Sequence, residues 1–340
     1  MNLRPERLAE LLDGFAGRRV LVVGDLVADE YVYGETTRVS REAPVLILRH
    51  VGRRVIPGGA GNAMLNLAAL DAVAVPVALL GVGETSSLVI AELAARGVDA
   101  SGIVRDAERV AVRKTRVMAG GPHGQKQQIL RIDQDDLSPV SAGAGAKLRE
   151  TALAQLGTCE AVLMSDYGYG TLAPAVRDAV LREARRRGVP VCADSRYALR
   201  EFSGVTYATP NADEAQAAWG RPIRGEDDLR AAGEALRASL DAEFLLLTRG
   251  HDGMAVCERS GAFTSYPVWG EAEAADVTGA GDTVAAASLL ALLAGASPRE
   301  AAQVATIAAG IVVQKHGAAT TTREEIERVA GIRREAPKPR

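Results

Sequence analysis

The sequence has few cysteines, few aromatic residues and no excess of positive charge. Its three cysteines, Cys159, Cys192 and Cys257, are scattered and odd in number, which argues against a disulfide framework or a Cys-x-x-Cys metal site. Aromatic residues make up only 4% of the chain, too few for a surface that stacks nucleic-acid bases. With Lys+Arg 40 against Asp+Glu 43, the net charge of -3 gives no attraction to nucleic acid or to an anionic membrane.

Long hydrophobic runs are also missing. The longest apolar stretch, residues 284–296, is shorter than the ~20 residues that a membrane-spanning helix needs. Residues 1–6 include an early acidic residue and lack the apolar core of a signal peptide. We therefore predict a cytoplasmic protein with neither nucleic acid nor membrane as a partner. The 340 residues are 47% hydrophobic and 24% charged, enough for a substantial core.

Apolar strand-like segments alternate with helical patterns over most of the chain. The expected strands are residues 19–25, 76–81, 161–166, 190–194 and 243–248, and the expected helices are residues 4–15, 59–70, 144–156, 173–187 and 227–239. Such alternation predicts a mostly parallel sheet with helices on both faces, a three-layer α/β/α core.

Two more polar segments, residues 31–55 and 111–133, have the texture of exposed antiparallel strands. We interpret them as one small inserted sheet, called the lid, with its strands within about 26–56 and 110–135. Residues 1–330 are then expected to form a single domain, and residues 331–340 a disordered tail.

Polar residues stand where several predicted strands end. In open parallel sheets, ligands gather outside the carboxyl ends of the strands. One polar strand end is usually a helix cap, but several of them predict a site. They are Asp25, Asp166, Asp194 and Thr248.

Residues 276–283 read Asp-Val-Thr-Gly-Ala-Gly-Asp-Thr and lead into an apolar helical run. The first N–H groups of a helix lack partners and lie at the positive end of its dipole, so the backbone of Gly279, Ala280 and Gly281 can hold an anion. Asp282 adds a carboxylate beside it. Phosphoryl transfer to an alcohol needs both an anion site and a base. The alternative is that Thr278 caps a buried helix whose glycines allow close packing.

Two glycine motifs resemble a known family. Residues 58–62, Gly-Gly-Ala-Gly-Asn, and residues 276–282 resemble the two signatures of the ribokinase-like (phosphofructokinase-B-type) carbohydrate kinases. The resemblance covers nearly the whole chain and implies a ribokinase-like fold. Within the family, residues 29–34, 38–45, 165–167 and 209–211 are most similar to the heptose-7-phosphate kinase domain of lipopolysaccharide and nucleotide-heptose synthesis.

The resemblance implies a role for each part of the site. Asp282 would take the proton from the sugar hydroxyl, and the amides of Gly279, Ala280 and Gly281 would form the anion hole. The implied substrate-binding residues are Asp25, Gly58, Gly59, Asn62, Asn66, Arg131, Asp166 and Arg196. The alternative is that Asn62 is a helix cap and Asp25 a solvated strand end.

The same resemblance implies ATP and Mg²⁺. Glu214 would hold Mg²⁺ through water, which suits a cation that keeps several of its waters. The implied nucleotide-binding residues are Asn211, Glu214, Thr248, Gly250, Gly253, Lys315 and Gly317. The alternatives are that Asn211 caps the following helix and that residues 248–253 form a plain turn.

The substrate prediction comes from this resemblance, and the positively charged residues of the related kinases are only partly present in this sequence. The related kinases usually carry a lysine in the segment that reads Gly168-Tyr169-Gly170 here, and Asp194-Ser195-Arg196 replaces their Asp-Pro-Lys. A guanidinium binds phosphate bidentately, so Arg196 can take over that task. The other candidate cations, which could equally be a solvated face of the lid, are Lys114, Arg116 and Arg131.

We therefore predict an ATP- and Mg²⁺-dependent kinase of a sugar or sugar phosphate, most like a heptose 7-phosphate 1-kinase. The lid would cover the sugar and exclude water, and its exposed face predicts a homodimer through the lid. The alternatives are a ribokinase- or fructokinase-type enzyme for a neutral sugar and a non-catalytic sugar- or nucleotide-sensing relative. A dinucleotide-dependent oxidoreductase is disfavoured because no Gly-x-Gly-x-x-Gly follows the first strand.

Overall fold

The structure is a computed structural model that describes residues 3–121, 126–270 and 274–332. Within these residues a nine-stranded sheet has the order β13-β12-β11-β10-β9-β8-β1-β4-β5. Its strands are β1 (Arg19–Gly24), β4 (Val73–Val82), β5 (Ile103–Val110), β8 (Ala161–Asp166), β9 (Val191–Ser195), β10 (Tyr207–Ala208), β11 (Phe244–Thr248), β12 (Met254–Glu258) and β13 (Phe263–Tyr266). Only the β11–β12 and β12–β13 pairs are antiparallel, so the predicted mostly parallel sheet is confirmed for the described residues.

The strands are apolar on both faces because helices cover both faces. In β1, Val20 and Val22 belong to one hydrophobic cluster, whereas Leu21 and Val23 belong to the other. Strands buried on two sides read as continuous apolar runs, which is why the sequence revealed them.

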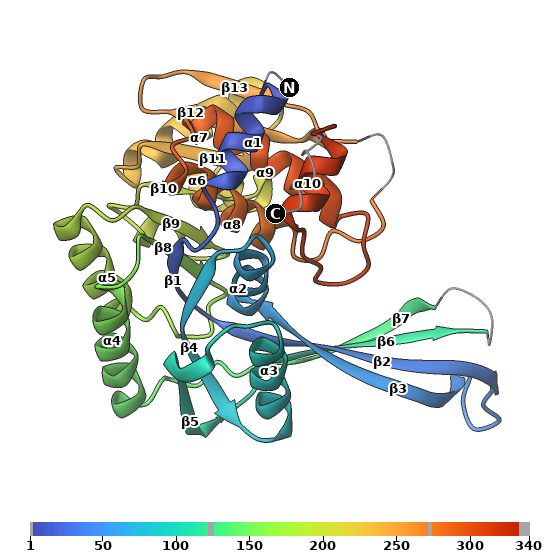
Figure 1. The fold of residues 1–340 in the computed structure, drawn as a ribbon. Helices are drawn as coiled ribbons and strands as arrows, with labels where there is room; N and C mark the ends of the chain where they lie inside the picture. Colours follow the sequence, from blue (N-terminus) through green and yellow to red (C-terminus); the bar gives the residue numbers. More distant parts are fainter. Residues whose placement is uncertain (1–2, 122–125, 271–273, 333–340) are drawn as a thin grey trace, which may run out of the picture.

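Figure 1 shows the helical layers on the two faces of the sheet. One layer contains α1 (Pro5–Asp13), α2 (Ala60–Ala69), α3 (Glu84–Ala95), α8 (Ala280–Leu293), α9 (Pro298–Val312) and α10 (Arg323–Val329). The other contains α4 (Ala142–Leu156), α5 (Pro174–Arg187), α6 (Ala212–Trp219) and α7 (Glu226–Ser239). No helix in the described part of the chain has the length and apolar character needed to cross a membrane.

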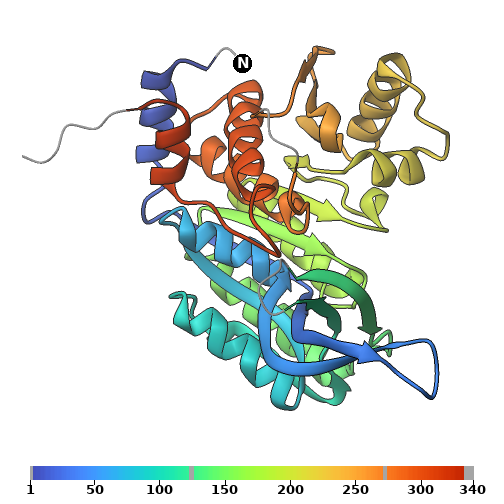
Figure 2. The same cartoon turned by 90° about the vertical axis from the view of Figure 1, so that its right-hand side faces the viewer.

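The lid is a second sheet that projects from the core (Figures 1 and 2). Among the described residues it has four strands in the order β3-β2-β6-β7, namely β2 (Leu26–Val39), β3 (Leu46–Gly59), β6 (Arg113–Gly120) and β7 (Gln127–Gln134). The prediction of one inserted sheet is confirmed, and each of its two segments is an antiparallel pair, β2 with β3 and β6 with β7. The two pairs are joined by β2 and β6, which run parallel to each other. Both strands leave the core at the same place, with Ala28 opposite Arg113, and run outward together.

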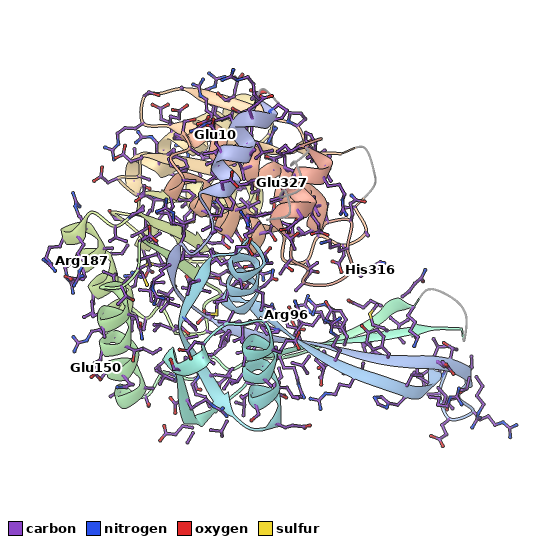
Figure 3. The ribbon with its side chains drawn as sticks, viewed as in Figure 1. Glu10, Arg96, Glu150, Arg187, His316 and Glu327 are labelled. Carbon is purple, nitrogen blue, oxygen red and sulfur yellow. The ribbon has the colours of Figure 1, made fainter. Side chains whose placement is uncertain are left out.

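The surface is charged and the thiols are interior. Charged side chains such as Glu150 on α4 and Arg187 on α5 point outward from their helices (Figure 3). The three cysteines are buried and form no disulfide bond. Of the tail predicted for residues 331–340, residues 333–340 lie outside the described part of the chain.

The sheet order brings the polar strand ends together. Strand β8 lies between β1 and β9 and runs parallel to both. Asp25 follows β1, Asp166 ends β8, and Asp194 lies near the end of β9. These three carboxylates therefore share one edge of the sheet, as predicted from the positions of the strands.

Candidate active site

Residues 279–282, called the anion turn, begin helix α8. Gly279 precedes the helix with φ +80°, a left-handed conformation that glycine adopts without strain. A Cβ atom there would lie 2.3 Å from Nδ2 of Asn62. Among the described residues, the N–H groups of Gly281 and Asp282 have no acceptor, and a Cβ atom at Gly281 would meet open space. The turn thus offers free amides to an anion at the positive end of a helix dipole.

The carboxylate of Asp282 is buried and held at both oxygens. Its exposed fraction is only 3%. Nδ2 of Asn62 donates to Oδ2 at 2.9 Å, and the hydroxyl of Tyr167 donates to Oδ1 at 3.1 Å. The same Asn62 amide lies 3.2 Å from the carbonyl oxygen of Gly279, to which it also donates. Helix α2 and the loop after β8 therefore fix the carboxylate beside the anion turn.

Electrostatics prepare Asp282 to accept a proton. Burial raises its pKa to about 7; the hydrogen bonds from Asn62 and Tyr167 and the charge of Lys114 lower the pKa, whereas the charge of Asp29 raises it. A general base works best when its pKa lies near the working pH. At neutral pH this carboxyl group is therefore both partly ionised and basic enough to take a proton from an alcohol in the transition state.

Asn62 and Asn66 connect α2 to α8. Both side chains are fully buried. Nδ2 of Asn66 donates to the carbonyl oxygen of Asn62 at 3.0 Å, and Oδ1 of Asn66 accepts from the hydroxyl of Thr283 at 2.9 Å. Since both polar atoms of Asn66 are used inside the protein, the predicted sugar contact of Asn66 finds no support. Asn62 likewise serves the base and the anion turn in this structure.

Asp25 anchors the loop that follows β8. Its Oδ2 accepts the backbone N–H groups of Tyr167 and Tyr169 at 2.9 Å each, and its Oδ1 accepts that of Thr171 at 2.9 Å. With 1% of its surface exposed, Asp25 gives no support to the alternative of a solvated strand end. The predicted sugar contact finds no support either, because the carboxylate is occupied by three amides that hold Tyr167 in place.

Three other predicted sugar ligands line up along the same edge. Asp166 accepts the hydroxyl of Ser195 at 2.7 Å, and burial raises its pKa above the ordinary value. Gly59 has φ +59°, and a Cβ atom there would lie 2.6 Å from the carbonyl oxygen of Asp25. A Cβ atom at Gly58 would overlap the Asp29 carboxylate. The glycines therefore allow other parts of the protein chain to approach closely. The sugar contacts of Gly58, Gly59 and Asp166 stay predictions.

Three of the candidate cations, Lys114, Arg116 and Arg131, lie on the lid, and Arg196 follows β9 of the core. Burial lowers the pKa of Lys114, and the neighbouring charges of Arg196 and Arg131 lower it further. Arg116 is paired with Asp29 and Arg131 with Asp133. Within the described residues, neither Lys114 nor Arg196 has a carboxylate within 4.0 Å, the limit for an ion pair. Two adjacent unpaired cations, one of them buried, form a place where an anion is stabilised.

On the other side of the anion turn lies a pocket of about 580 Å³. Its walls come from the end of β11 and the following turn, from residues 268–270, 274 and 277, and from α8 and α9. The lining residues are Thr248, Gly250, His251, Gly253, Met254, Val268, Trp269, Gly270, Ala274, Val277, Ala280, Gly281, Val284, Thr306, Ala309, Gly310, Val313 and Gln314. The three residues predicted from the β11 turn to contact nucleotide, namely Thr248, Gly250 and Gly253, all line this pocket.

Asn211 and Glu214 form the N-terminal cap of α6. Oδ1 of Asn211 accepts the N–H of Glu214, and Glu214 accepts the N–H of Asn211, both at 2.9 Å. The capping alternative is therefore confirmed, and it leaves one oxygen of Glu214 available. Burial raises the pKa of Glu214 and, together with the charges of Glu214 and Asp282, raises that of Asp194 well above its ordinary value. The described residues hold no cluster of three metal-ligating side chains, so Glu214 and Asp194 fit only a Mg²⁺ that keeps most of its waters and is held through them.

The two residues predicted from the 315–317 turn do not line the pocket. The ammonium of Lys315 donates to the Glu325 carboxylate at 2.7 Å and to the Thr320 carbonyl oxygen at 2.7 Å. The N–H of Gly317 donates to Asp276 at 2.8 Å. Both contacts hold the turn itself, so the structure gives no support to a nucleotide contact by either residue.

The sequence analysis did not identify some residues of the site on either side of the anion turn. Tyr167 lies in segment 165–167, directly after the predicted strand of residues 161–166. This position at a strand end could have identified it as a residue of the site. Trp269 and Gly310 contact each other at the pocket wall, where a Cβ atom at Gly310 would lie 2.7 Å from the Trp269 carbonyl oxygen. No motif marks them, because apolar lining residues have no chemical signature in a single sequence.

The chain belongs to the pfkB family of carbohydrate kinases. The family model described as pfkB family carbohydrate kinase matches residues 18–325. Membership identifies the chain as a sugar kinase and confirms the resemblance expected from its two glycine motifs.

Two curated relatives are similar to the chain over most of its length. The chain is 40% identical over 307 residues to the Bifunctional protein HldE of Geobacter metallireducens, covering 90% of this chain and 61% of that protein. It is 36% identical over 320 residues to the Bifunctional protein HldE of Gluconobacter oxydans, covering 94% of this chain and 65% of that protein. The chain thus spans less than two thirds of the length of these relatives.

Solved structures confirm the ribokinase-like fold. Phosphofructokinase-2 from Escherichia coli in complex with substrates and products has a TM-score of 0.75 at 17% identity, covering 92% of this chain and 98% of that one. Arabidopsis thaliana ribokinase complexed with ribose and ATP has a TM-score of 0.69 at 20% identity, covering 93% and 99%.

Proposed function

We propose that this kinase transfers the terminal phosphoryl group of ATP to a hydroxyl of a sugar phosphate, with heptose 7-phosphate as substrate and its carbon-1 hydroxyl as acceptor. The observation that carries the substrate class is that neither Lys114 nor Arg196 has a carboxylate partner among the described residues. The charge of Lys114 also lowers the pKa of Asp282, which supports a place for the anionic end of the sugar on the lid side of the base. A sugar with an anionic end satisfies both cations at once.

Asp282 supplies the proton acceptor. Its Oδ1 and Oδ2 are each held by one donor, which leaves lone pairs for a sugar hydroxyl. As the bond between the sugar oxygen and phosphorus forms, the hydroxyl proton moves to Asp282 and the ADP oxygen leaves with its electron pair.

The anion turn stabilises the charge that develops on the transferred group. The free N–H groups of Gly281 and Asp282 are fixed before the reaction begins, so no reorganisation is needed to receive the phosphoryl oxygens. When bound, Mg²⁺ draws charge from the ATP phosphates, and Glu214 and Asn211 would hold it through water. The apolar pocket beside the turn has room for the nucleoside of ATP.

Two alternatives are weaker. A kinase of a neutral sugar leaves the buried Lys114 without an anionic partner among the described residues. A non-catalytic sensing protein has no need for a carboxylate with a pKa of about 7 beside free amides.

A substrate panel with coupled detection of ADP tests the proposal. We expect turnover with heptose 7-phosphate, and much less with unphosphorylated heptose, ribose or fructose. The Asp282→Asn variant is the blank for ATP hydrolysis by contaminants. Selective turnover of ribose or fructose, with none on heptose 7-phosphate, would falsify the proposed substrate.

We also propose a homodimer through the lid. Large apolar side chains on its outer strands are exposed, including Val51 at 51% and Ile132 at 55%. Exposed apolar strands are stabilised when a second chain covers them. Sedimentation should give a dimer for the wild type and a monomer for Ile132→Lys; a wild-type monomer at micromolar concentration contradicts the dimer.

A further inference from the structure

Tyr167 lies between the base and the lid. It is the first residue after β8, and its hydroxyl donates to Oδ1 of Asp282 at 3.1 Å. Its ring faces Lys114 of the lid, whose Nζ lies 5.9 Å from the ring centroid. A Cβ atom at Gly59 would lie 3.5 Å from the ring, so the end of β3 packs against it as well.

The backbone of Tyr167 is fixed independently of its hydroxyl. Asp25 accepts the N–H groups of Tyr167, Tyr169 and Thr171, each at 2.9 Å. The buried carboxylate of Asp25 thus holds three residues of one loop. Because the loop is anchored in this way, removal of the hydroxyl alone should leave the ring in place.

We propose that Tyr167 is a positioning residue for the base: its hydroxyl fixes the rotation of the Asp282 carboxylate and keeps it charged until the acceptor hydroxyl arrives. This inference rests on the proposed function, in which Asp282 removes the proton. A donor to a carboxylate stabilises the charged form more than the neutral form. Loss of the donor therefore makes the carboxyl harder to ionise.

Other charges reach Asp282 from several elements. Burial raises its pKa, Asn62 of α2 and Lys114 of β6 lower it, and Asp29 of β2 raises it. Asp194 of β9 also faces it, since the charge of Asp282 raises the pKa of Asp194. The substitution Tyr167→Phe leaves these groups unchanged, so a shift in the titration of Asp282 reports the missing hydroxyl.

The test titrates Asp282 directly in the protein without substrates. Carbon-13 NMR of aspartate labelled at the side-chain carboxyl follows ionisation, and Asp282→Asn assigns the signal. We expect Tyr167→Phe to raise the midpoint by about one pH unit, the size expected for loss of one hydrogen bond to a charged group. Tyr169→Phe is the matched control, because the Tyr169 hydroxyl donates to Asp135 at 2.7 Å instead. Its midpoint for Asp282 should equal that of the wild type.

A second variant should shift the titration midpoint of Asp282 in the opposite direction. Site-specific 3-fluorotyrosine at position 167 is a stronger hydrogen-bond donor, so the Asp282 midpoint should fall below that of the wild type. The acidic limb of the kcat/KM profile should move in the same directions, upward for Tyr167→Phe and downward for fluorotyrosine. Unchanged midpoints in both variants overturn the role of Tyr167. An inactive wild type with shifted midpoints would instead refute the proposed function alone.

Discussion

The two sides of the anion turn are built from different kinds of residues. On the lid side, charged groups are fixed by partners, as in the pair Arg116–Asp29, or left unpaired, as in Lys114. On the other side, glycines and apolar residues such as Trp269 and Ala309 line a pocket of about 580 Å³. Under the proposed function, the difference means that the acceptor is recognised by charge and the nucleoside by shape and burial.

The turn itself belongs to both sides. Asp282 faces Tyr167 and Lys114 toward the lid, whereas Ala280 and Gly281 line the pocket proposed for the nucleotide. Helix α8 is apolar and buried around most of its circumference, so the turn cannot shift without disturbing the core. One rigid helix start therefore sets the relative position of the base and the nucleotide pocket.

Loss of the base should have the largest effect and should leave both binding sites intact. We expect Asp282→Asn to lower kcat by about a thousandfold or more, in line with general-base contributions. The Kd of ATP from calorimetry should stay within about twofold, since the change is isosteric. Asp227→Asn, which changes an exposed carboxylate of α7, is the control. An Asp282→Asn variant with near-normal kcat would contradict the base assignment.

A smaller effect is expected when the charge on the lid side is removed. Lys114→Met keeps the length of the side chain but loses its charge. The KM of the sugar phosphate should rise about 10- to 100-fold, as expected for one charge-assisted hydrogen bond, while the KM of ATP changes little. Lys126→Met changes a lid lysine at the outer end of β7, where it lies over Tyr33, and should leave both values unchanged. A rise in the KM of ATP alone would reverse the assignment of the two sides.

A bulky side chain in the apolar pocket should weaken ATP binding and leave binding of the sugar phosphate unchanged. Ala309 is a small residue of α9 at the pocket wall. We expect Ala309→Phe to raise the KM of ATP about tenfold, because the added ring occupies volume that the nucleoside would bury. The KM of the sugar phosphate should not change, and Ala309→Ser should behave like the wild type. An unchanged KM of ATP in Ala309→Phe would place the nucleoside elsewhere.

The sequence allowed accurate prediction where a single local pattern determines the structure. The run of residues 161–166 is observed as β8 with the same bounds, because a strand buried on both faces needs apolar residues throughout. Residues 279–282 begin a helix because Gly279 takes a positive φ and an apolar run follows. Helix α9 was missed although Ser297 and Glu300 form a capping box at its start.

Contacts between distant segments could not be predicted. The bond from Asn62 to Asp282 joins residues 220 positions apart, and neither neighbourhood shows that the amide serves the carboxylate instead of a sugar. Lys315 was predicted to contact the nucleotide, but its ammonium group forms an ion pair with Glu325 on α10. The parallel pairing of β2 with β6 depends on where both strands leave the core, which no local pattern records.

Phosphorus-31 NMR of the product tests most directly whether charge holds one end of the sugar while Asp282 activates the other. With ATP and heptose 7-phosphate, we expect the original phosphate signal to persist beside a new signal coupled to the proton on carbon 1. A product without a phosphate on carbon 1 would contradict this account. Release of inorganic phosphate without formation of a new sugar phosphate would contradict it as well.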